Sequence, residues 1–165
     1  EEICSSWFSE GVKNVDPKVA SLYYAADRLY HKAEILDYVS QGNVVILDRY
    51  VESNMAFQGG KLFEVKQREE MYAWIEKLEY GLLELPKPDE IIFLYMPYEY
   101  ACMLKKNRSS LDEHEKDASI LLNAEKAYLE LAEYYCYQKI ECVKDGTIRS
   151  IEDIHEEIFK RVLKN

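Results

Sequence analysis

Long apolar runs and positive charge are both scarce in this sequence of 165 residues. No run approaches the roughly 20 apolar residues that a transmembrane helix needs, and the acidic start Glu1-Glu2 is unlike a signal peptide. The 21 Lys and Arg residues face 31 Asp and Glu residues, which gives a formal net charge of -10. Binding to nucleic acid or to an anionic membrane requires a basic face, so we expect neither partner.

Cysteine is also infrequent, and its pattern excludes two further classes. No Cys-x-x-Cys pair and no Cys/His spacing suited to zinc is present. Because nothing else suggests secretion, we expect the thiols to be reduced, buried, small apolar side chains of a cytoplasmic protein. The four cysteines are Cys4, Cys102, Cys136 and Cys142.

The periodicity of apolar residues predicts an α/β fold. A chain of this length forms one domain with a single core, so we expect one domain over residues 1–165. Strands alternate with helices, which predicts an open parallel sheet covered by helices. Helices are expected over 17–40, from about 50, and over 65–85, 98–106, 121–135 and 151–162, with strands over 44–47, 91–96 and 140–143. Core-facing stripes are expected at Met71, Trp74, Ile75, Leu78 and Leu82, and at Ile151, Ile154, Ile158 and Val162.

The candidate site follows the apolar segment 44–47, whose lack of polar alternation is typical of a central parallel strand. Asp48 and Arg49 come next, at the strand end where open α/β sheets bind ligands. An Asp can hold a metal ion through water, and the planar fork of an Arg matches phosphate oxygens. In the alternative interpretation, Asp48 caps the following helix and Arg49 pairs with a surface acid. The dipeptide alone leaves both open.

The longer string resembles a known signature. Ile46-Leu47-Asp48-Arg49-Tyr50, followed by Ser53-Asn54 and Ala56-Phe57-Gln58, resembles the signature of the thymidylate kinase family of P-loop nucleoside monophosphate kinases. Deoxynucleoside kinases also place Asp-Arg here, but the Ser-Asn and Ala-Phe-Gln continuation favours the monophosphate kinases. The segment 21–28 and the string Leu85-Pro86-Lys87-Pro88-Asp89 resemble the same family.

The resemblance implies a three-layer α/β fold and phosphoryl transfer from ATP to dTMP, giving dTDP and ADP for dTTP synthesis, with Mg2+. It implies that Tyr24 stacks on thymine and Arg28 binds a thymine carbonyl, although many members have Phe at the position of Tyr24. From the residues alone, this pair also fits an ordinary amphipathic fringe over the core. Arg49 would grip the acceptor phosphate and Asp48 would support the metal through water. The acceptor pocket would be lined by Ser53, Asn54, Phe57 and Gln58, with Phe57 crowding a ribose 2′-hydroxyl.

Two further segments acquire a role by resemblance. Residues 107–117 carry dense mixed charge, which is ordinarily a solvated loop. In the family this segment is the lid over the two nucleotides, and Arg108 would assist transfer. Lys106, Asp112 and Glu115 are the other lid residues, and the turn at Asp145-Gly146 would lie beside the adenine of ATP. Family members are usually homodimers, so we expect the same here.

One family element is missing. The family needs Gly-x-x-x-x-Gly-Lys-Ser/Thr, because its backbone amides wrap the phosphates of ATP, and the 6 glycines of this sequence form no such string. We therefore expect the first strand, this loop and the first helix to precede Glu1. A kinase of another deoxynucleotide or of a deoxynucleoside is the alternative enzyme. A non-catalytic nucleotide-binding protein that lacks the loop is the alternative from another class.

Overall fold

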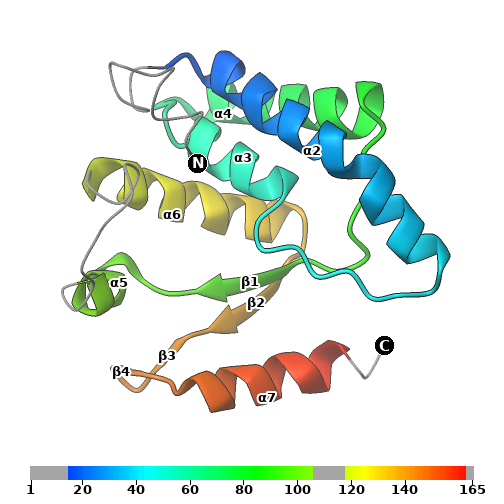
Figure 1. The fold of residues 1–165 in the computed structure, drawn as a ribbon. Helices are drawn as coiled ribbons and strands as arrows, with labels where there is room; N and C mark the ends of the chain where they lie inside the picture. Colours follow the sequence, from blue (N-terminus) through cyan, green and yellow to red (C-terminus); the bar gives the residue numbers. More distant parts are fainter. Residues whose placement is uncertain (1–14, 106–117, 163–165) are drawn as a thin grey trace. The chain divides into compact units, whose positions relative to one another are not determined.

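The computed structural model describes residues 15–105 and 118–162, and Figure 1 shows their helices and strands in order. The chain divides into two compact units. Of the described residues, unit 1 contains 15–87 and 118–128, and unit 2 contains 88–105 and 129–162. The single domain expected over 1–165 stays a prediction, and each unit is described by itself.

Unit 1 is helical. It contains α2 (Pro17–Ser40), α3 (Val51–Gly59), α4 (Val65–Glu76), the π-helix η2 (Lys77–Leu82) and the first part of α6 (Ala118–Tyr134). The predicted start of α2 is confirmed, because the Asp16 carboxylate accepts hydrogen bonds from the amides of Lys18 and Val19 at 2.8 and 3.2 Å. Pro17 occupies the first turn, where no amide is needed.

The core of unit 1 gathers around the short helix α3, which packs against α2 and α4. Val51, Met55 and Ala56 of α3 are buried, as are Met71 and Ile75 of α4. The expected continuous helix over 65–85 instead passes from α4 into η2. A π-helix bonds to the fifth residue rather than the fourth, so it shifts which side chains face inward. Leu82, expected in the core, is therefore 70% exposed.

The strand expected over 44–47 is wrong. These residues form an irregular segment between α2 and α3, and Val44 and Ile46 are 84% and 89% exposed. A strand is stabilised by hydrogen bonds to a neighbouring strand, and in the part of the chain that the structure describes no strand pairs with this segment. The unbroken apolar run predicted a strand covered on both faces, and the exposure of Val44 and Ile46 shows that this burial is wrong as well.

Unit 2 contains a parallel pair of strands, which confirms the predicted combination of helices with a parallel sheet. In this pair, β1 (Ile92–Tyr95) lies beside β2 (Gln138–Glu141), with Ile92 opposite Gln138. The hairpin β3 (Val143–Lys144) and β4 (Thr147–Ile148) follows. Its turn residues Asp145 and Gly146 both have positive φ, 51° and 73°, as a tight two-residue hairpin turn requires. The predicted turn is thus confirmed.

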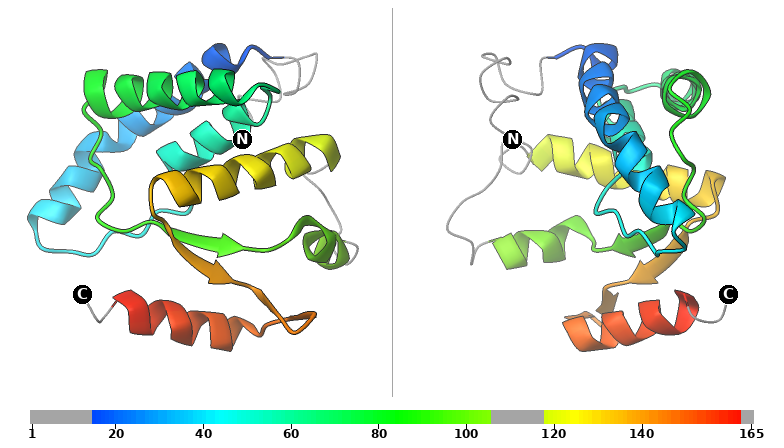
Figure 2. Two further views of the ribbon diagram at one scale, coloured as in Figure 1. Left: turned by 180° about the vertical axis from the view of Figure 1, so that it is seen from behind. Right: turned by 45° about the vertical axis from the view of Figure 1, so that its right-hand side comes forward.

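Two helices complete unit 2: α5 (Tyr98–Lys105) and α7 (Ile151–Val162), which lies beside β2 in both views of Figure 2. The predicted start of α7 is confirmed, because the Ser150 hydroxyl accepts a hydrogen bond from the amide of Asp153 at 3.1 Å and so caps the helix. The predicted inward stripe of α7 is wrong at its ends, because Ile151 and Val162 are exposed. Only Ile154 and Ile158 are partly covered.

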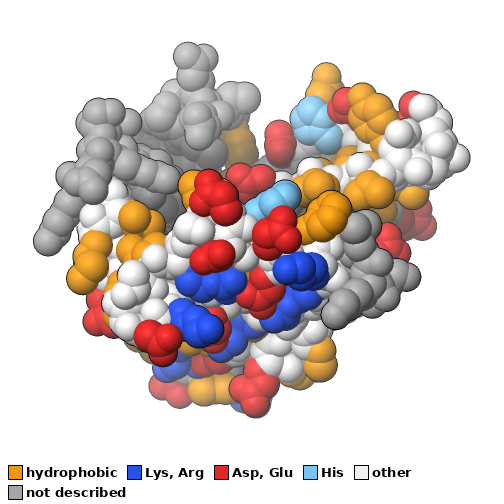
Figure 3. Space-filling model, turned by 90° about the horizontal axis from the view of Figure 1, so that it is seen from below, with side chains coloured by type: hydrophobic (Ala, Val, Ile, Leu, Met, Phe, Trp, Pro, Cys, Tyr) orange, Lys and Arg blue, Asp and Glu red, His pale blue; other side chains and the backbone are white. Residues whose placement is uncertain are grey.

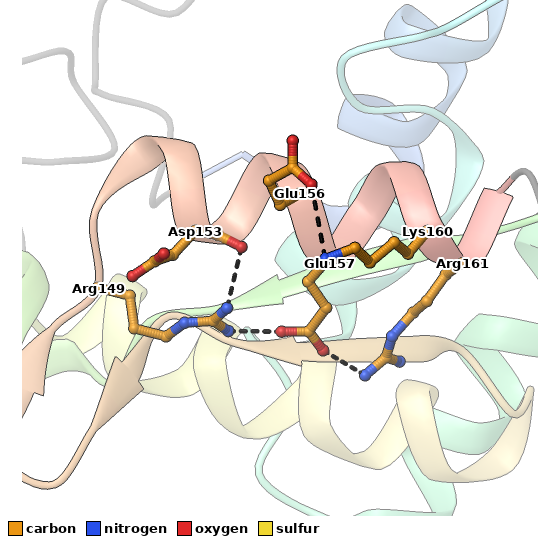
Figure 4. Close-up of a pocket in the computed structure, with 6 residues that line it drawn as sticks. All are labelled: Arg149, Asp153, Glu156, Glu157, Lys160 and Arg161. Carbon is orange, nitrogen blue, oxygen red and sulfur yellow. Dashed lines mark hydrogen bonds and ion pairs between the residues drawn. The ribbon is translucent and has the colours of Figure 1, made fainter.

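Charged side chains attach α7 to the sheet of unit 2. Figure 3 shows acidic and basic side chains intermixed on the face seen from below. The Glu157 carboxylate accepts hydrogen bonds from Arg149 at 2.6 Å and Arg161 at 2.5 Å (Figure 4). These arginines also donate to the backbone carbonyls of Glu141 and Lys139 in β2, so Glu157 links α7 to the sheet.

The cysteines are free where they are described. Cys142 is buried as expected and Cys102 is half-buried. Cys136 is exposed, because it lies in the turn after α6 with a φ of 53°. Cys4 lies outside the described residues. None of the described helices combines the length and the apolar composition that a membrane span needs.

Replacing Glu157 by Gln should make the thermal stability less dependent on acidic pH. The hydrogen bond from Arg149 is the main cause that lowers the pKa of the Glu157 carboxyl from its ordinary value. The hydrogen bond from Arg161 acts in the same direction, and desolvation opposes both. A carboxyl with a lowered native pKa stabilises the fold above its ordinary pKa, and this stabilisation is lost as the pH falls through the native pKa. E157Q should therefore melt below the wild type at pH 7, and the difference should vanish toward pH 3. Glu156→Gln is the control, because the pair that Glu156 forms with Lys160 is exposed. Equal melting curves for all three proteins would contradict this role of Glu157.

Candidate functional site

Asp48 and Arg49 lie directly before α3, and both are exposed. Tyr50, not Asp48, occupies the cap position of α3 and makes no side-chain cap bond, so the alternative role of Asp48 as a cap is wrong. Arg49 has a φ of 68°, which is uncommon for a residue with a side chain. Such strained backbone is often found at functional sites. The guanidinium carbon of Arg49 lies 5.5 Å from the ring centroid of Phe57.

The next turn of α3 contacts α6. The Tyr128 hydroxyl donates a hydrogen bond to Ser53 Oγ at 2.6 Å, and the rings of Tyr128 and Phe57 meet edge to face at 6.2 Å. Burial raises the pKa of the Tyr128 phenol, so the hydroxyl keeps its proton at physiological pH. Tyr128 was not predicted as a site residue, because its bond to Ser53 joins residues too distant in sequence for a local signal.

A buried carboxylate organises the opposite side of α3. Glu79 of η2 is 0% exposed and accepts two hydrogen bonds from Arg28, at 2.5 Å from Nε and 2.7 Å from Nη2. Asn54 Nδ2 donates to the same carboxylate at 2.9 Å. A buried charge is tolerated only when it is paired and hydrogen-bonded, and here both conditions are met. Glu79 was not predicted as a site residue, although it lies one helical turn after Ile75 and so interrupts an apolar face.

Two tyrosines border this network. The Tyr80 hydroxyl donates to Glu52 Oε1 at 2.6 Å, and the Tyr50 hydroxyl donates to the Pro86 carbonyl at 3.1 Å. Burial, only partly opposed by the Arg28 charge, raises the pKa of Tyr50 to about 12, and burial also raises the pKa of Tyr80. Both phenols therefore remain hydrogen-bond donors, and they help to fix the start of α3.

Some buried amide groups of α3 lack partners. Gln58 is 0% exposed, yet neither of its amide atoms has a hydrogen-bond partner among the described residues. The same holds for Asn54 Oδ1. An unsatisfied buried polar atom costs roughly 1–3 kcal/mol, so proteins seldom keep one without a reason. A polar ligand that binds beside α3 would supply that reason.

The structure thus brings together some predicted residues and not others. Arg28 and Asn54 meet on Glu79, and Ser53 and Phe57 meet on Tyr128. Tyr24 is half-buried on α2, one turn before Arg28. Asp145 and Gly146 belong to unit 2 and are described with it. The predicted lid residues Lys106, Arg108, Asp112 and Glu115 lie outside the described residues.

A pocket on α7 contains none of the predicted site residues. Its two arginines pair with Glu157 and its lysine pairs with Glu156, as Figure 4 shows. It is therefore part of the ionic attachment of α7 rather than a candidate binding site. The pocket is lined by Arg149, Asp153, Glu156, Glu157, Lys160 and Arg161.

Comparison with known proteins gives a consistent result. The family model for thymidylate kinase matches residues 8–158. A probable thymidylate kinase of Pyrococcus horikoshii is 32% identical over 143 residues, which are 86% of this chain and 63% of that protein. Probable thymidylate kinase 1 of Saccharolobus solfataricus is 31% identical over 91% of this chain and 70% of its own length. A probable thymidylate kinase of Pyrobaculum aerophilum is 32% identical over 98% of this chain and 78% of its own length. This chain therefore spans less than two thirds of the Pyrococcus protein.

Removing the Tyr128 hydroxyl should destabilise unit 1. Tyr128→Phe leaves Ser53 Oγ without its donor in a partly buried position, and we expect a loss of about 1 kcal/mol in the free energy of unfolding, measured by urea denaturation. Tyr134→Phe on the same helix is the control, because Tyr134 is 78% exposed. Equal losses in the two variants would mean that the bond to Ser53 contributes nothing.

Proposed function

Because the chain belongs to the thymidylate kinase family, we propose that the protein transfers the terminal phosphoryl group of ATP to the 5′-phosphate of dTMP, giving dTDP and ADP for dTTP synthesis. The observation that carries this proposal is the polar face of α3, where Asn54 and Gln58 are buried without full hydrogen bonding. A nucleotide bound there would provide the missing partners.

Base recognition is assigned to Tyr24 and Arg28. Of the five N–H groups of a guanidinium, Arg28 spends two on Glu79, which leaves donors for a base carbonyl. The ring of Tyr24, half-buried one turn away on α2, would stack on the base. Asn54 and Gln58 would complete the hydrogen bonds to the base.

The acceptor phosphate is assigned to Arg49. Among the described residues this arginine forms no ion pair, so the alternative that it serves a surface acid finds no support. Its unneutralised charge and strained backbone suit a residue that binds phosphate oxygens. Phe57, which lies against Arg49, would crowd a ribose 2′-hydroxyl and favour deoxyribose. Ser53, fixed by Tyr128, would complete this side.

The ATP side of the site is assigned to a turn and to the predicted lid. Asp145 and Gly146 would lie beside the adenine of ATP, and Arg108 with Lys106, Asp112 and Glu115 would belong to a lid over the phosphates. Catalysis would then consist of positioning and charge stabilisation, without a covalent intermediate on the protein. The 165 residues contain no Gly-x-x-x-x-Gly-Lys-Ser/Thr string, so a protein that binds dTMP without turnover is the second candidate.

Mg2+ is the metal that fits these residues. No group of three or more His, Cys, Asp or Glu side chains forms a metal site within 15–105 and 118–162. Mg2+ commonly needs only one or two carboxylates, with waters and substrate phosphates as its other ligands, and the exposed Asp48 provides one carboxylate. Asp48 would hold the ion through water, and the ion would neutralise charge on the phosphates.

We also propose that the protein is a homodimer that pairs through α2. Leu22, Leu29 and Leu36 recur every seven residues and are all exposed, and the small residues Ala26 and Ala33 alternate with them. A seam of alternating large and small residues can pack against its own copy, because each Leu meets an Ala.

The cytoplasmic location, and the absence of nucleic-acid and membrane partners, stay predictions from composition.

Calorimetry with dTMP tests the acceptor site. The wild-type chain should bind dTMP more tightly than thymidine. Arg49→Ala should weaken dTMP binding roughly 10- to 100-fold, the equivalent of a lost charge-assisted hydrogen bond, and should leave thymidine binding unchanged. Lys66→Ala removes the same charge from an exposed position on α4 and should change neither affinity. An R49A protein with wild-type affinity for dTMP would refute the assignment of Arg49 to the acceptor phosphate. A separate assay for conversion of ATP and dTMP by the gene-encoded protein distinguishes a kinase from a protein that binds dTMP without turnover.

Sedimentation analysis tests the dimer. Leu29→Glu places two like charges near the centre of the α2 seam, so the dimer should dissociate to monomers at micromolar concentration. Gln67→Glu adds the same charge to an exposed position on α4 and should leave the dimer intact. A monomeric wild type, or a dimer that L29E does not weaken, would exclude this interface.

A further inference from the structure

Glu79 is the buried acid to which the two base-reading residues are attached. It lies in the π-helix η2 and is 0% exposed. Its carboxylate accepts hydrogen bonds from Arg28 of α2 and Asn54 of α3, and both donors reach the same oxygen, Oε1. One carboxylate therefore fixes the distance between these two side chains as well as the direction of each.

The bonds to Glu79 determine what each partner can offer a ligand. Arg28 is held through Nε and Nη2, so the plane of its guanidinium is fixed and Nη1 remains as a donor. Asn54 must turn Nδ2 toward the carboxylate, because its carbonyl oxygen would be repelled there. Asn54 Oδ1 is consequently left as an acceptor, and it is buried without a partner among the described residues. Glu79 thus leaves a donor group on Arg28 and an acceptor atom on Asn54, two side chains that meet on one carboxylate.

The secondary structure around Glu79 keeps this arrangement rigid. The neighbouring residue Tyr80 donates to Glu52 of α3, so two consecutive side chains of η2 hold α3 from the same segment. The Arg28 guanidinium also lies 6.0 Å from the ring centroid of Tyr50. π-Helical turns are frequently found at functional sites, and here the turn brings both side chains of the pair to α3.

We infer that Glu79 is a positioning residue that sets base selectivity by presenting Arg28 as a donor beside Asn54 as an acceptor. This inference rests on the proposed function. Thymine and uracil offer a carbonyl oxygen beside an N3–H group, which complements that pair. Cytosine offers an amino group beside an unprotonated ring nitrogen. Its donor would therefore face the donor of Arg28, and its acceptor would face the acceptor of Asn54. Glu79 therefore selects against cytosine and does not separate thymine from uracil.

The test compares the binding of dTMP, dUMP and dCMP by calorimetry. Glu79→Gln keeps the shape but removes the charge, and it places an amide N–H among the donors of Arg28 and Asn54. We expect dTMP affinity to fall roughly 10- to 100-fold while dCMP affinity changes little, so that the ratio of the two affinities approaches one. Glu79→Asp, which keeps the charge but withdraws it, should show a smaller loss of the same kind. Glu76→Gln is the matched control, because Glu76 is one helical turn away and its pair with Lys87, at 3.5 Å, is exposed.

The outcomes separate this inference from the proposed function. A wild-type chain that binds neither dTMP nor dUMP overturns the proposed function, and the inference with it. The inference alone is overturned by a different result. In that result the wild type prefers dTMP, the E79Q or E79D variant is folded, as a cooperative melting curve shows, and the variant has the same ratio of dTMP affinity to dCMP affinity as the wild type. A lower melting temperature with an unchanged ratio means that Glu79 is merely structural. If E79Q does not fold, the ratio measured for E79D decides: a lower ratio supports the positioning role, and a wild-type ratio refutes it.

Discussion

The requirement that a buried charge be fully bonded governs the arrangement of unit 1. Glu79 would cost several kcal/mol in isolation, and hydrogen bonds from Arg28 and Asn54 offset that cost. Because these partners come from α2 and α3 while Glu79 comes from η2, three elements must take one relative position to satisfy it. Apolar packing of Val51, Met55 and Ile75 supplies the driving force, but it would tolerate small shifts that the carboxylate does not.

The short helix α3 shows the consequence of that constraint. Its apolar residues face the core, whereas Asn54 and Gln58 are equally buried but remain incompletely bonded. A sequence selected only for stability would place apolar residues at these positions, because an unsatisfied amide lowers stability. Natural proteins break such local rules mainly at functional sites. The strained φ of Arg49 at the start of the same helix is a second departure of this kind.

The sequence predicted those features that depend on neighbours in the chain. The helix starts at Pro17 and Ile151 and the turn at Asp145-Gly146 were predicted, because the bonds that fix them, such as those to Asp16 and Ser150, span only a few residues. The strand at 44–47 failed because strand formation depends on a partner that no local pattern specifies. Glu79 and Tyr128 were missed for a related reason: their bonds to Arg28 and Ser53 join residues 51 and 75 positions apart. Of the proposed site, the signature 46–58 was therefore identifiable in the sequence, and the residues that fix it were not.

In the proposed site, two arginines in different environments would serve two different tasks. Arg28 is half-buried and its charge is cancelled by Glu79, so it acts as a directed hydrogen-bond donor in a region where a free charge would be expensive. A neutral base requires direction rather than charge, and a cancelled guanidinium provides it. Arg49 is exposed and has no carboxylate partner among the described residues, so its charge is available to a phosphate group, whose negative charge requires it. Exchanging the two environments would harm both tasks, because an unpaired Arg28 would lose its orientation and a neutralised Arg49 would lose its attraction for phosphate.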